Sequence, residues 1–530
     1  MTATPPTSAC WKKKANTGRR LPVRPAMTFM KAINRDILKL AVPSILANIT
    51  VPIVGMVDIA VAGHLDGAVA TMIGGIAIGT MLFDLLYWNF GFLRVGTGGL
   101  TAQAFGKEDR KECAIILTRA LGISLSCALI LIAIQWIFVK AAFMVVDCTP
   151  EVRELASQYF YIRIWAAPAT LSLMAFKGWF IGMQDSVSPM VTDFVVNGMN
   201  VLMSIVLALG IPLGSGSADL LSPGVSDQLA TEATRTWLIR PMGFYGIAAG
   251  TVVAQYSGLL ISLILLAFKY VRSTFAGLSA EDLKETFRGS ETRRFFVMNT
   301  DLFVRSLCFI AIYIGFTTIS ARYGDLLLAV SSILMKLLMI FSYFTDGFAY
   351  AGEALTGKYI GAKNGPMLNQ TVKWTFVWSM AIAVIFMGIY QFAGVPMLRM
   401  MTSDPAVIEQ AREFMPWLLL MPVIGCAAFT WDGIYIGATA SKEIRNAMLW
   451  AVVAFVLVWL AGTVCLNYAP PEHAKLATLR YRMEMDPSYA HRHNVVEMHI
   501  LMAAYFAHLL ARTIYLTVRS TKCLYQKRDI

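Results

Sequence analysis

Charged residues are scarce in this chain. Asp, Glu, Lys and Arg make up only 15% of its 530 residues, whereas an ordinary soluble domain contains roughly 25%. Apolar residues make up 57% of the sequence, and the mean hydropathy is +0.60. This composition excludes a cytosolic enzyme, a disordered protein and a secreted disulfide scaffold. Because a transmembrane helix needs about 20 residues, the chain has room for many spans, and we predict a polytopic membrane protein.

Cysteine motifs and metal-binding motifs are also lacking. The eight cysteines form no Cys-x-x-Cys pair and several lie in apolar runs, so we interpret them as packing residues. His491, His493 and His499 have neither cysteines nor clustered carboxylates beside them, and we interpret their segment as a loop without metal. We expect no metal and no cofactor.

Twelve apolar runs follow the polar N-terminal segment, in two sets of six. The first set lies at about 38–63, 68–96, 114–143, 157–184, 187–211 and 242–270. The second set lies at about 295–321, 326–357, 371–398, 407–438, 444–468 and 494–518. We therefore predict an all-α integral membrane protein with twelve transmembrane helices in two six-helix bundles.

The predicted domain boundaries follow from these runs. The N-terminal lobe covers 30–270 and the C-terminal lobe covers 295–518, with basic tails at 1–29 and 519–530. The charged linker 271–294 has an amphipathic pattern, which predicts a helix lying along the cytoplasmic face of the membrane. The two longest loops between runs, 212–241 and 469–493, are expected to be irregular surface segments.

The distribution of basic residues predicts the orientation in the membrane. With both termini in the cytoplasm, 28 of the 45 Lys and Arg residues fall in inside segments and 12 fall in outside loops. Cytoplasmic loops are enriched in Lys and Arg, so we expect both termini to be cytoplasmic. The net charge of +12 then reflects this orientation, and we expect no nucleic-acid partner.

An internal repeat relates the two sets of runs. A shift of 255 residues places Gly106 on Gly361 and aligns KGWFIGMQDS (177–186) with DGIYIGATAS (432–441). Six helices per repeat give both halves the same orientation, which makes the repeat parallel, with an axis along the membrane normal. Two such bundles suit a transporter that rocks around a central cavity.

Charged residues inside the apolar runs are the candidate functional groups, because each costs about 2.5–3.5 kcal/mol at the bilayer centre. Asp58 is the most isolated, in VPIVGMVDIAVAGHL. Burial disfavours its charged form, so it can exchange a proton or hold Na⁺ reversibly. The alternative is a carboxylate that only holds helices together. The full set is Asp58, Asp84, Arg94, Lys177, Asp193, Arg305, Lys336, Asp346, Glu353 and Asp432.

The spacing of other polar residues leaves alternatives open. Asn197, Asn200 and Ser204 share one helix face, where they either line a polar pocket with Asp58 or satisfy hydrogen bonds between helices. Structural pairing is the favoured interpretation of two further sets of charges. Asp346 and Glu353 share a face and have Arg305 as a candidate partner, while Lys177 and Asp432 occupy equivalent repeat positions with opposite charge, where pairing across the bundles is conceivable.

Several motifs resemble the MATE (multidrug and toxic compound extrusion) transporters, in particular the DinF-type branch. The segments LKLAVPSILANITVPIVGMVDIAVAGHLDG and FLRVGTGGLTAQAFGKED are similar to the first two helices of that family, and KGWFIGMQDS and GKYIGAKN also fit. The likeness covers roughly residues 30–520. It implies an antiporter of the bacterial inner membrane that exchanges inward H⁺ or Na⁺ for outward cationic or amphipathic small molecules. We expect a monomer whose other partner is the lipid bilayer.

The resemblance also implies roles for individual residues. Asp58 matches the acidic residue of the first helix implicated in cation coupling, and Asn200 matches an asparagine of the same polar network. Family members often carry an aspartate where this chain has Ser204. Without that carboxylate, a proton site at Asp58 is favoured over a Na⁺ site.

Two alternatives to an antiporter remain. A lipid-linked saccharide flippase of similar architecture would favour a cationic cavity, whereas acids outnumber bases six to four in the set of charges above. A membrane-embedded enzyme would require a nucleophile or a paired histidine and carboxylate in a recognisable context. The sequence offers no such constellation, so we do not expect an enzyme.

Overall fold

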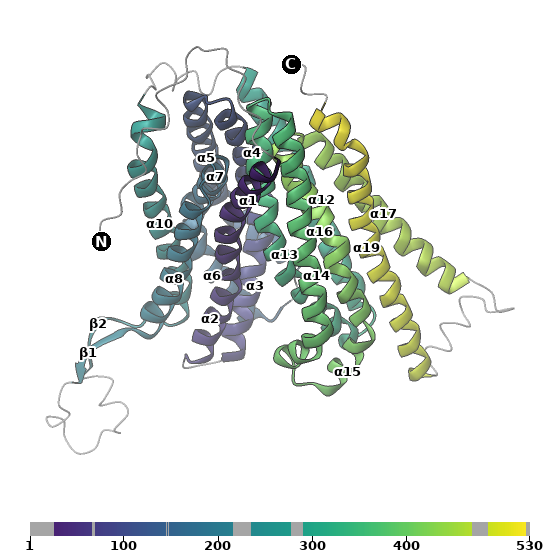
Figure 1. Cartoon of the computed structure of the whole chain (residues 1–530). Coiled ribbons are helices and arrows are strands. Elements are labelled where there is room, and N and C mark those ends of the chain that lie inside the picture. Colours follow the sequence, from purple (N-terminus) through teal and green to yellow (C-terminus); the bar gives the residue numbers. More distant parts are fainter. Residues whose placement is uncertain are drawn as a thin grey trace, which may run out of the picture.

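The computed structural model describes residues 26–65, 69–144, 146, 148–215, 235–276, 290–468 and 486–525, and it is almost entirely helical (Figure 1). Twelve helical segments of the described chain are long and apolar enough to cross a membrane. They coincide with the twelve predicted runs, which confirms the fold class. Most segments extend beyond the apolar run because the helices continue into amphipathic ends.

The N-terminal lobe contains the first six candidate spans, and several of them consist of two helices in sequence. The first span breaks at Thr50, and the next helix begins at Val51 with Pro52 in its first turn. The elements are α1 (Ala26–Ile49), α2 (Val51–Gly63), α3 (Val69–Tyr87), η2 (Trp88–Gly91), α4 (Phe92–Gly106), α5 (Arg110–Ala142), α6 (Pro150–Arg163), η3 (Ile164–Ala166), α7 (Ala167–Gly182), α8 (Val187–Leu209), α10 (Phe244–Leu266) and the π-helix η5 (Ala267–Phe275).

The C-terminal lobe contains the other six spans, and its helices are longer. The short helix α15 lies between two spans, at the end of the molecule opposite to the C-terminus (Figure 1). The elements are α12 (Ser290–Ala321), α13 (Asp325–Gly361), α14 (Gly365–Met401), α15 (Pro405–Glu413), α16 (Met415–Gly437), α17 (Ser441–Tyr468) and α19 (Pro487–Tyr525).

Three segments between spans differ from the sequence prediction. An antiparallel pair, β1 (Ile211–Ser215) and β2 (Arg235–Ile239), stands where an irregular loop was expected, because Thr236, Trp237 and Ile239 favour strands. Helix α19 begins inside the predicted loop 469–493, of which 469–485 lies outside the described residues. The predicted surface helix over 271–294 is described only at its ends, where it belongs to η5 and α12.

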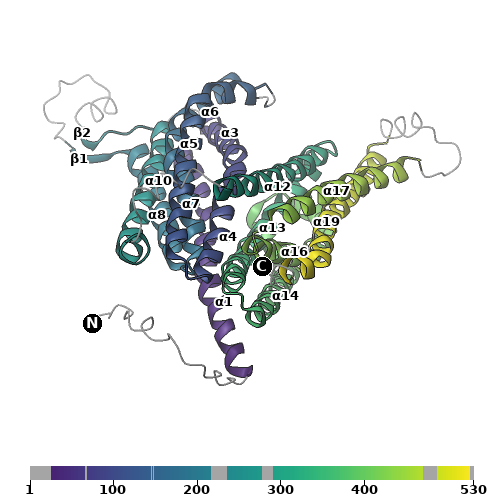
Figure 2. The same cartoon turned by 90° about the horizontal axis from the view of Figure 1, so that it is seen from above.

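The two lobes lie side by side and share an interface (Figure 2). Helix α1 packs on α13 of the opposite lobe, with Ile37 and Ala41 in one buried cluster with Phe348 and Leu355. Helices α4 and α16 also meet at this interface. The start of α1 and the end of α19 lie at the same end of the molecule (Figure 1).

Close helix crossings confirm the internal repeat. A Cβ atom at Gly178 would lie 2.1 Å from the carbonyl oxygen of Arg94, and one at Gly433 would lie 2.1 Å from that of Ala349. Arg94 and Ala349 are 255 residues apart, and so are Gly178 and Gly433. Only glycine permits such an approach of two helices, so the alignment of the two halves reflects the same crossing built twice.

The turns that end α4 and α13 repeat in the same way. Glu108 and Lys363, again 255 residues apart, have φ of 62° and 52°. Each is followed by a residue whose side chain caps the next helix: Asp109 accepts from the backbone N–H of Glu112 at 2.9 Å, and Asn364 accepts from that of Met367 at 3.2 Å. The turns GKED (106–109) and GAKN (361–364) therefore have the same structure in the two lobes.

The lobes touch most closely at the end where these turns lie. A Cβ atom at Gly106 would lie 2.0 Å from the carbonyl oxygen of Lys358, and one at Gly361 would lie 2.1 Å from that of Gln103. A Cβ atom at Gly99 would lie 2.3 Å from the carbonyl oxygen of Ile436. We call the contacts of Gly99, Gly106 and Gly361 the glycine seal, since they close the lobes against each other at this end.

Candidate functional site in the N-terminal lobe and at the lobe interface

Asp58 lies in α2 with its side chain only 5% exposed. The hydroxyl of Ser204 in α8 donates to its Oδ1 at 3.0 Å. Among the described residues no cation forms an ion pair with this carboxylate. The structure therefore places the isolated acid of the first span beside Ser204, which is one of the two arrangements that the sequence left open.

The two asparagines of α8 have other partners. The amide of Asn200 donates to the Thr251 hydroxyl of α10 at 2.9 Å, and that of Asn197 donates to the Thr50 hydroxyl at the break between α1 and α2. Of the three polar residues on this helix face, only Ser204 contacts Asp58. Asn197 instead ties α8 to the break in the first span.

Arg163, at the end of α6, belongs to this region and the sequence analysis missed it. Its guanidinium donates to the Tyr159 hydroxyl at 3.1 Å and to the Thr80 hydroxyl at 3.4 Å, and it lies 4.9 Å from the ring centre of Phe83. It forms no ion pair with a carboxylate of the described chain. The signal was available, because Arg163 lies inside the apolar run 157–184 as Lys177 does.

Asp84 in α3 follows by one turn Thr80, whose hydroxyl accepts a hydrogen bond from Arg163. Its side chain is exposed, and the nearest charges that act on it are those of Arg163 and Lys336, the latter in α13 of the opposite lobe. Its own charge acts in turn on Tyr313 and Tyr343 of that lobe. Asp84 therefore faces the space between the lobes.

Glu353 of α13 pairs with Arg94 of α4 across the lobe interface. The two side chains are 3.2 Å apart, and the Glu353 side chain is fully buried. Arg94 also lies 4.3 Å from the ring centre of Tyr350. The expected pairing of Arg305 with Asp346 or Glu353 is wrong, since Arg305 has a partner in its own lobe.

That partner is Asp432 of α16. Arg305 of α12 lies 2.7 Å from its Oδ2, and Arg512 of α19 donates from Nε to its Oδ1 at 3.1 Å and from Nη2 to its Oδ2. Two guanidiniums thus balance one carboxylate. The predicted pairing of Lys177 with Asp432 is wrong, because Lys177 pairs with Asp193 of its own lobe at 2.7 Å.

Asp346 of α13 forms no ion pair within the described chain. It is partly buried, and the charges that act on it include those of Arg94, Arg305 and Lys177. Arg163 and Arg512 add two bases to the predicted set, which removes the excess of acids that was used against a cationic cavity. The missed Arg512 lies in LLARTIYL, inside the last apolar run.

The histidines set aside as a metal site have local partners. The Trp417 indole donates to Nδ1 of His499 at 2.8 Å, and His491 lies 3.0 Å from Oε1 of Gln410. Within the described residues no group of three His, Cys, Asp or Glu side chains could hold a metal ion.

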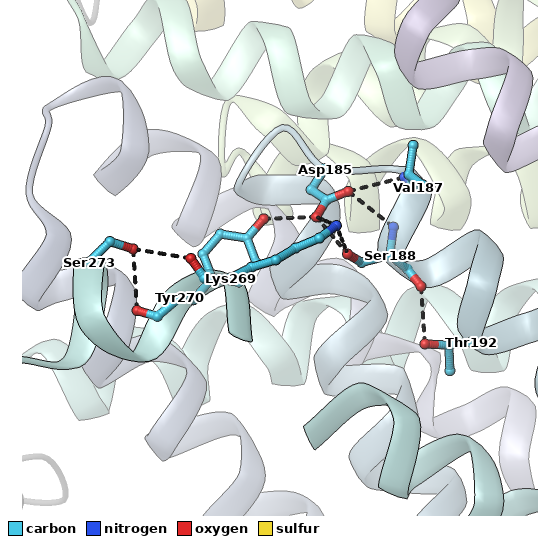
Figure 3. Close-up of polar contacts among 7 residues, drawn as sticks. All are labelled: Asp185, Val187, Ser188, Thr192, Lys269, Tyr270 and Ser273. Carbon is cyan, nitrogen blue, oxygen red and sulfur yellow. Dashed lines mark hydrogen bonds and ion pairs between the residues drawn. The ribbon is translucent and has the colours of Figure 1, made fainter. Parts of the chain in front are cut away.

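Asp185 organises the turn between α7 and α8, as Figure 3 shows. It accepts from the Ser188 hydroxyl at 2.6 Å, from Nζ of Lys269 at 3.1 Å and from the Tyr270 hydroxyl at 2.9 Å. Burial opposes the charged form, but the bonds from Ser188, Lys269 and Tyr270 outweigh it and hold the pKa of Asp185 below its usual value. Lys269 and Tyr270 belong to η5. This contact, which we call the Asp185 anchor, therefore ties the end of the sixth span to the turn between the fourth and fifth spans.

Comparison with known proteins agrees with this architecture. The MatE family matches residues 43–206 and 302–462, one segment in each lobe. The chain is 32% identical over 452 residues to DNA damage-inducible protein F of Escherichia coli K12, covering 83% of this chain and 91% of that protein. It is 23% identical over 450 residues to multidrug and toxin extrusion protein 1 of Oryctolagus cuniculus, covering 81% and 72% respectively.

Solved structures show the same fold. An outward-facing multidrug resistance MATE transporter superposes with a TM-score of 0.72 at 13% identity, over 94% of this chain and 99% of that one. A MOP superfamily transporter from Pyrococcus furiosus superposes with a TM-score of 0.71 at 13% identity and the same coverage. At such identities these structures support the fold alone. The family match over both lobes and the 32% identity to the Escherichia coli protein establish that this chain belongs to the MatE family of membrane transporters.

Proposed function

We propose that the chain is a secondary antiporter that exports organic cations or amphipathic compounds in exchange for H⁺. The two lobes alternate access to a central site, and Asp58 carries the exchanged proton. The observation that carries the proposal is the burial of Asp58 with one neutral hydrogen-bond donor, Ser204, and no ion-pair partner in the described chain. A carboxylate in that environment changes its charge at low cost to the fold.

The coordination around Asp58 supports H⁺ over Na⁺. Hard cations require several oxygen ligands at once, whereas the polar partner that touches the Asp58 carboxylate is the Ser204 hydroxyl. The oxygen that a second aspartate would provide is absent at this position. A proton requires only the one carboxylate.

The substrate class rests on the relatives and on the surface between the lobes. One relative is a multidrug and toxin extrusion protein. In this chain the exposed acid Asp84 faces Tyr313 and Tyr343 of the opposite lobe. Acidic and aromatic side chains together favour cations with apolar bodies. The excess of basic residues in predicted inside segments supports cytoplasmic termini, and the resemblance to a bacterial relative supports the bacterial inner membrane.

Transport in proteoliposomes tests the proposal. An imposed pH gradient should drive transport of ethidium or tetraphenylphosphonium by the purified wild-type protein. An imposed Na⁺ gradient of the same size should not drive it. Asp58→Asn should insert and fold normally and lose the pH-driven transport. Undiminished pH-driven transport by Asp58→Asn would refute the coupling role, and transport driven by Na⁺ alone would refute the choice of ion.

A further inference from the structure

Arg163 contacts α3 at Thr80, one turn before Asp84, and within the described chain it forms an ion pair with neither Asp84 nor Asp58. Its Nη1 is held by the Tyr159 and Thr80 hydroxyls at 3.1 Å and 3.4 Å, and the ring of Phe83 lies beneath it. Asp58 is buried, whereas Asp84 is exposed and its charge interacts with that of Lys336 in the opposite lobe. The charges of Asp58 and Asp84 both act on this guanidinium.

The packing around Tyr159 brings these groups together. Tyr159 is fully buried in a cluster with Val61 of α2, Ile76 of α3 and Ile247 of α10, and a Cβ atom at Gly79 of α3 would lie 2.6 Å from its ring. α2, α3 and α6 therefore meet around this ring. Because Tyr159 also hydrogen-bonds Arg163, the guanidinium is attached at the point where the helices carrying Asp58 and Asp84 converge.

We infer that Arg163 links the proton on Asp58 to cation binding at Asp84, by supplying one positive charge that either carboxylate can use. When Asp58 is ionised, Arg163 balances it and leaves Asp84 free to hold a cationic substrate. When Asp58 takes up a proton from the outer solution, the guanidinium is released to neutralise Asp84, and the substrate cation leaves. One proton enters for each positive charge that departs.

This inference rests on the proposed antiport and adds a mechanism to it. The proton and the substrate do not need to occupy the same place in order to compete. Such indirect competition is a coupling free energy between two sites, typically worth a 5–150-fold change in affinity. It is reciprocal, so substrate binding must also expel the proton.

Few other charges of the described chain face this site. α8 and α10 contribute the uncharged side chains Ser204, Asn200 and Thr251 next to α2. Lys336 acts on Asp84 from the opposite lobe. The titratable or charged groups on α2, α3, α6, α8 and α10 are Asp58, Asp84, Tyr87, Glu151, Arg153, Glu154, Tyr159, Tyr161, Arg163, Asp193, Tyr245 and Tyr256. Of these, Asp193 is paired with Lys177 of α7.

The test measures binding of tetraphenylphosphonium, a cation that does not titrate, to the purified full chain between pH 5.5 and 8.5. The wild type should bind it about tenfold more tightly at the upper end and release a proton into weakly buffered solution on binding. Asp84→Asn should weaken binding about tenfold at high pH. Arg163→Gln should bind with nearly the same Kd throughout, without proton release.

Two control variants separate charge from structure. Arg163→Lys keeps the positive charge and should restore both the pH dependence and the proton release. Arg153→Gln removes a charge from an exposed position of the same helix and should behave as wild type. Arg163→Gln with full wild-type proton release would overturn the inference, as would Asp84→Asn binding as tightly as wild type. If Arg163→Gln does not fold, loss of proton release in Arg163→Lys overturns it.

Failure of this inference is distinguishable from failure of the proposed function. If the wild type neither binds tetraphenylphosphonium nor couples its movement to H⁺, both are refuted. If the wild type is coupled and Asp58→Asn is inactive, but Arg163→Gln still releases protons on binding, only the role of Arg163 is refuted.

Discussion

The carboxylate of Glu353 fills the space that a side chain at Gly98 would occupy. A Cβ atom at Gly98 would lie 2.0 Å from Oε1 of Glu353, although the two residues belong to opposite lobes. Arg94, one turn earlier on the same helix, pairs with the other oxygen of that carboxylate at 3.2 Å. Helix α4 thus accommodates the buried Glu353 of the opposite lobe in two ways. Gly98 leaves space for its carboxylate, and Arg94 neutralises its charge.

We predict that Gly98→Ala weakens the closure of the lobes. Overpacking costs about 1–3 kcal/mol, which lowers the population of the closed state about 5–150-fold. Proteoliposome transport should slow accordingly, and hydrogen exchange should rise in the turns at 107–109 and 362–364. Gly388→Ala is the matched control, because a Cβ atom there meets nothing within 4 Å. Unchanged exchange in Gly98→Ala would contradict the prediction.

The Arg94–Glu353 pair predicts that removing Arg94 alone destabilises the protein more than replacing both residues. Arg94→Met leaves the fully buried Glu353 without a partner, and loss of one member of a buried pair costs about 3–5 kcal/mol. Adding Glu353→Gln should recover more than half of that loss. The measurement is thermal unfolding in detergent followed by intrinsic fluorescence. A double variant less stable than Arg94→Met would show that the carboxylate is not the source of the effect.

Ser204→Asp should give the protein a response to Na⁺. The Ser204 hydroxyl lies 3.0 Å from the Asp58 carboxylate, so a second carboxylate there would lie against the first. Two such acids do not both ionise unless a cation joins them. We expect transport by Ser204→Asp to be driven by a Na⁺ gradient, whereas Ser204→Asn, which adds no charge, should remain insensitive. A Na⁺-insensitive Ser204→Asp variant would contradict this account.

The Asp185 anchor predicts a stability difference that depends on pH. A carboxyl with a lowered pKa stabilises the fold above its unfolded value of about 3.9, and this contribution is lost as the pH falls through the folded pKa. Asp185→Asn should therefore lower the melting temperature at pH 7, by an amount equivalent to about 1–2 kcal/mol. The difference from wild type should begin to shrink below about pH 3.9 and should vanish only below the lowered folded pKa.

The control for this experiment is Asp109→Asn. Asp109 caps α5 by accepting from the backbone N–H of Glu112, and asparagine caps a helix about as well as aspartate. Its melting temperature should therefore follow that of the wild type at every pH. A pH-independent loss of stability in Asp185→Asn would show that the charge of the carboxylate is not what matters.

The spans and the repeat were predictable because both follow from local sequence. Each span appears in the sequence as an apolar run. The close helix crossings require glycines, such as Gly178 and Gly433, which made the repeat visible. The β1–β2 pair was not predicted, because its short strands adjoin polar and glycine-containing residues that also suit a loop. Helix ends were predicted short where amphipathic turns continue past the apolar run, as in α19.

The site was predictable only in part. Asp58 stands out because a lone carboxylate in an apolar run is expensive. The pairings of Arg305, Lys177 and Glu353 depend on how each helix is rotated, and a shift of one residue turns a side chain by about 100°. Arg163 lies inside the run 157–184 and was available as a candidate, but its position in the sequence does not show that its guanidinium donates to the Tyr159 hydroxyl.

The glycine seal has a mechanical consequence. At Gly106, Gly361 and Gly99 the nearest neighbours are carbonyl oxygens, so at these three points the two lobes meet through main chain. Main chain within a helix has no rotamers with which to follow a partner that drifts by an ångström. We therefore expect this interface to be either fully formed or fully separated, since packed interfaces are bistable. Partly open states have no contacts that stabilise them. Uncoupled passage of ions or substrate between the lobes is therefore expected to be rare.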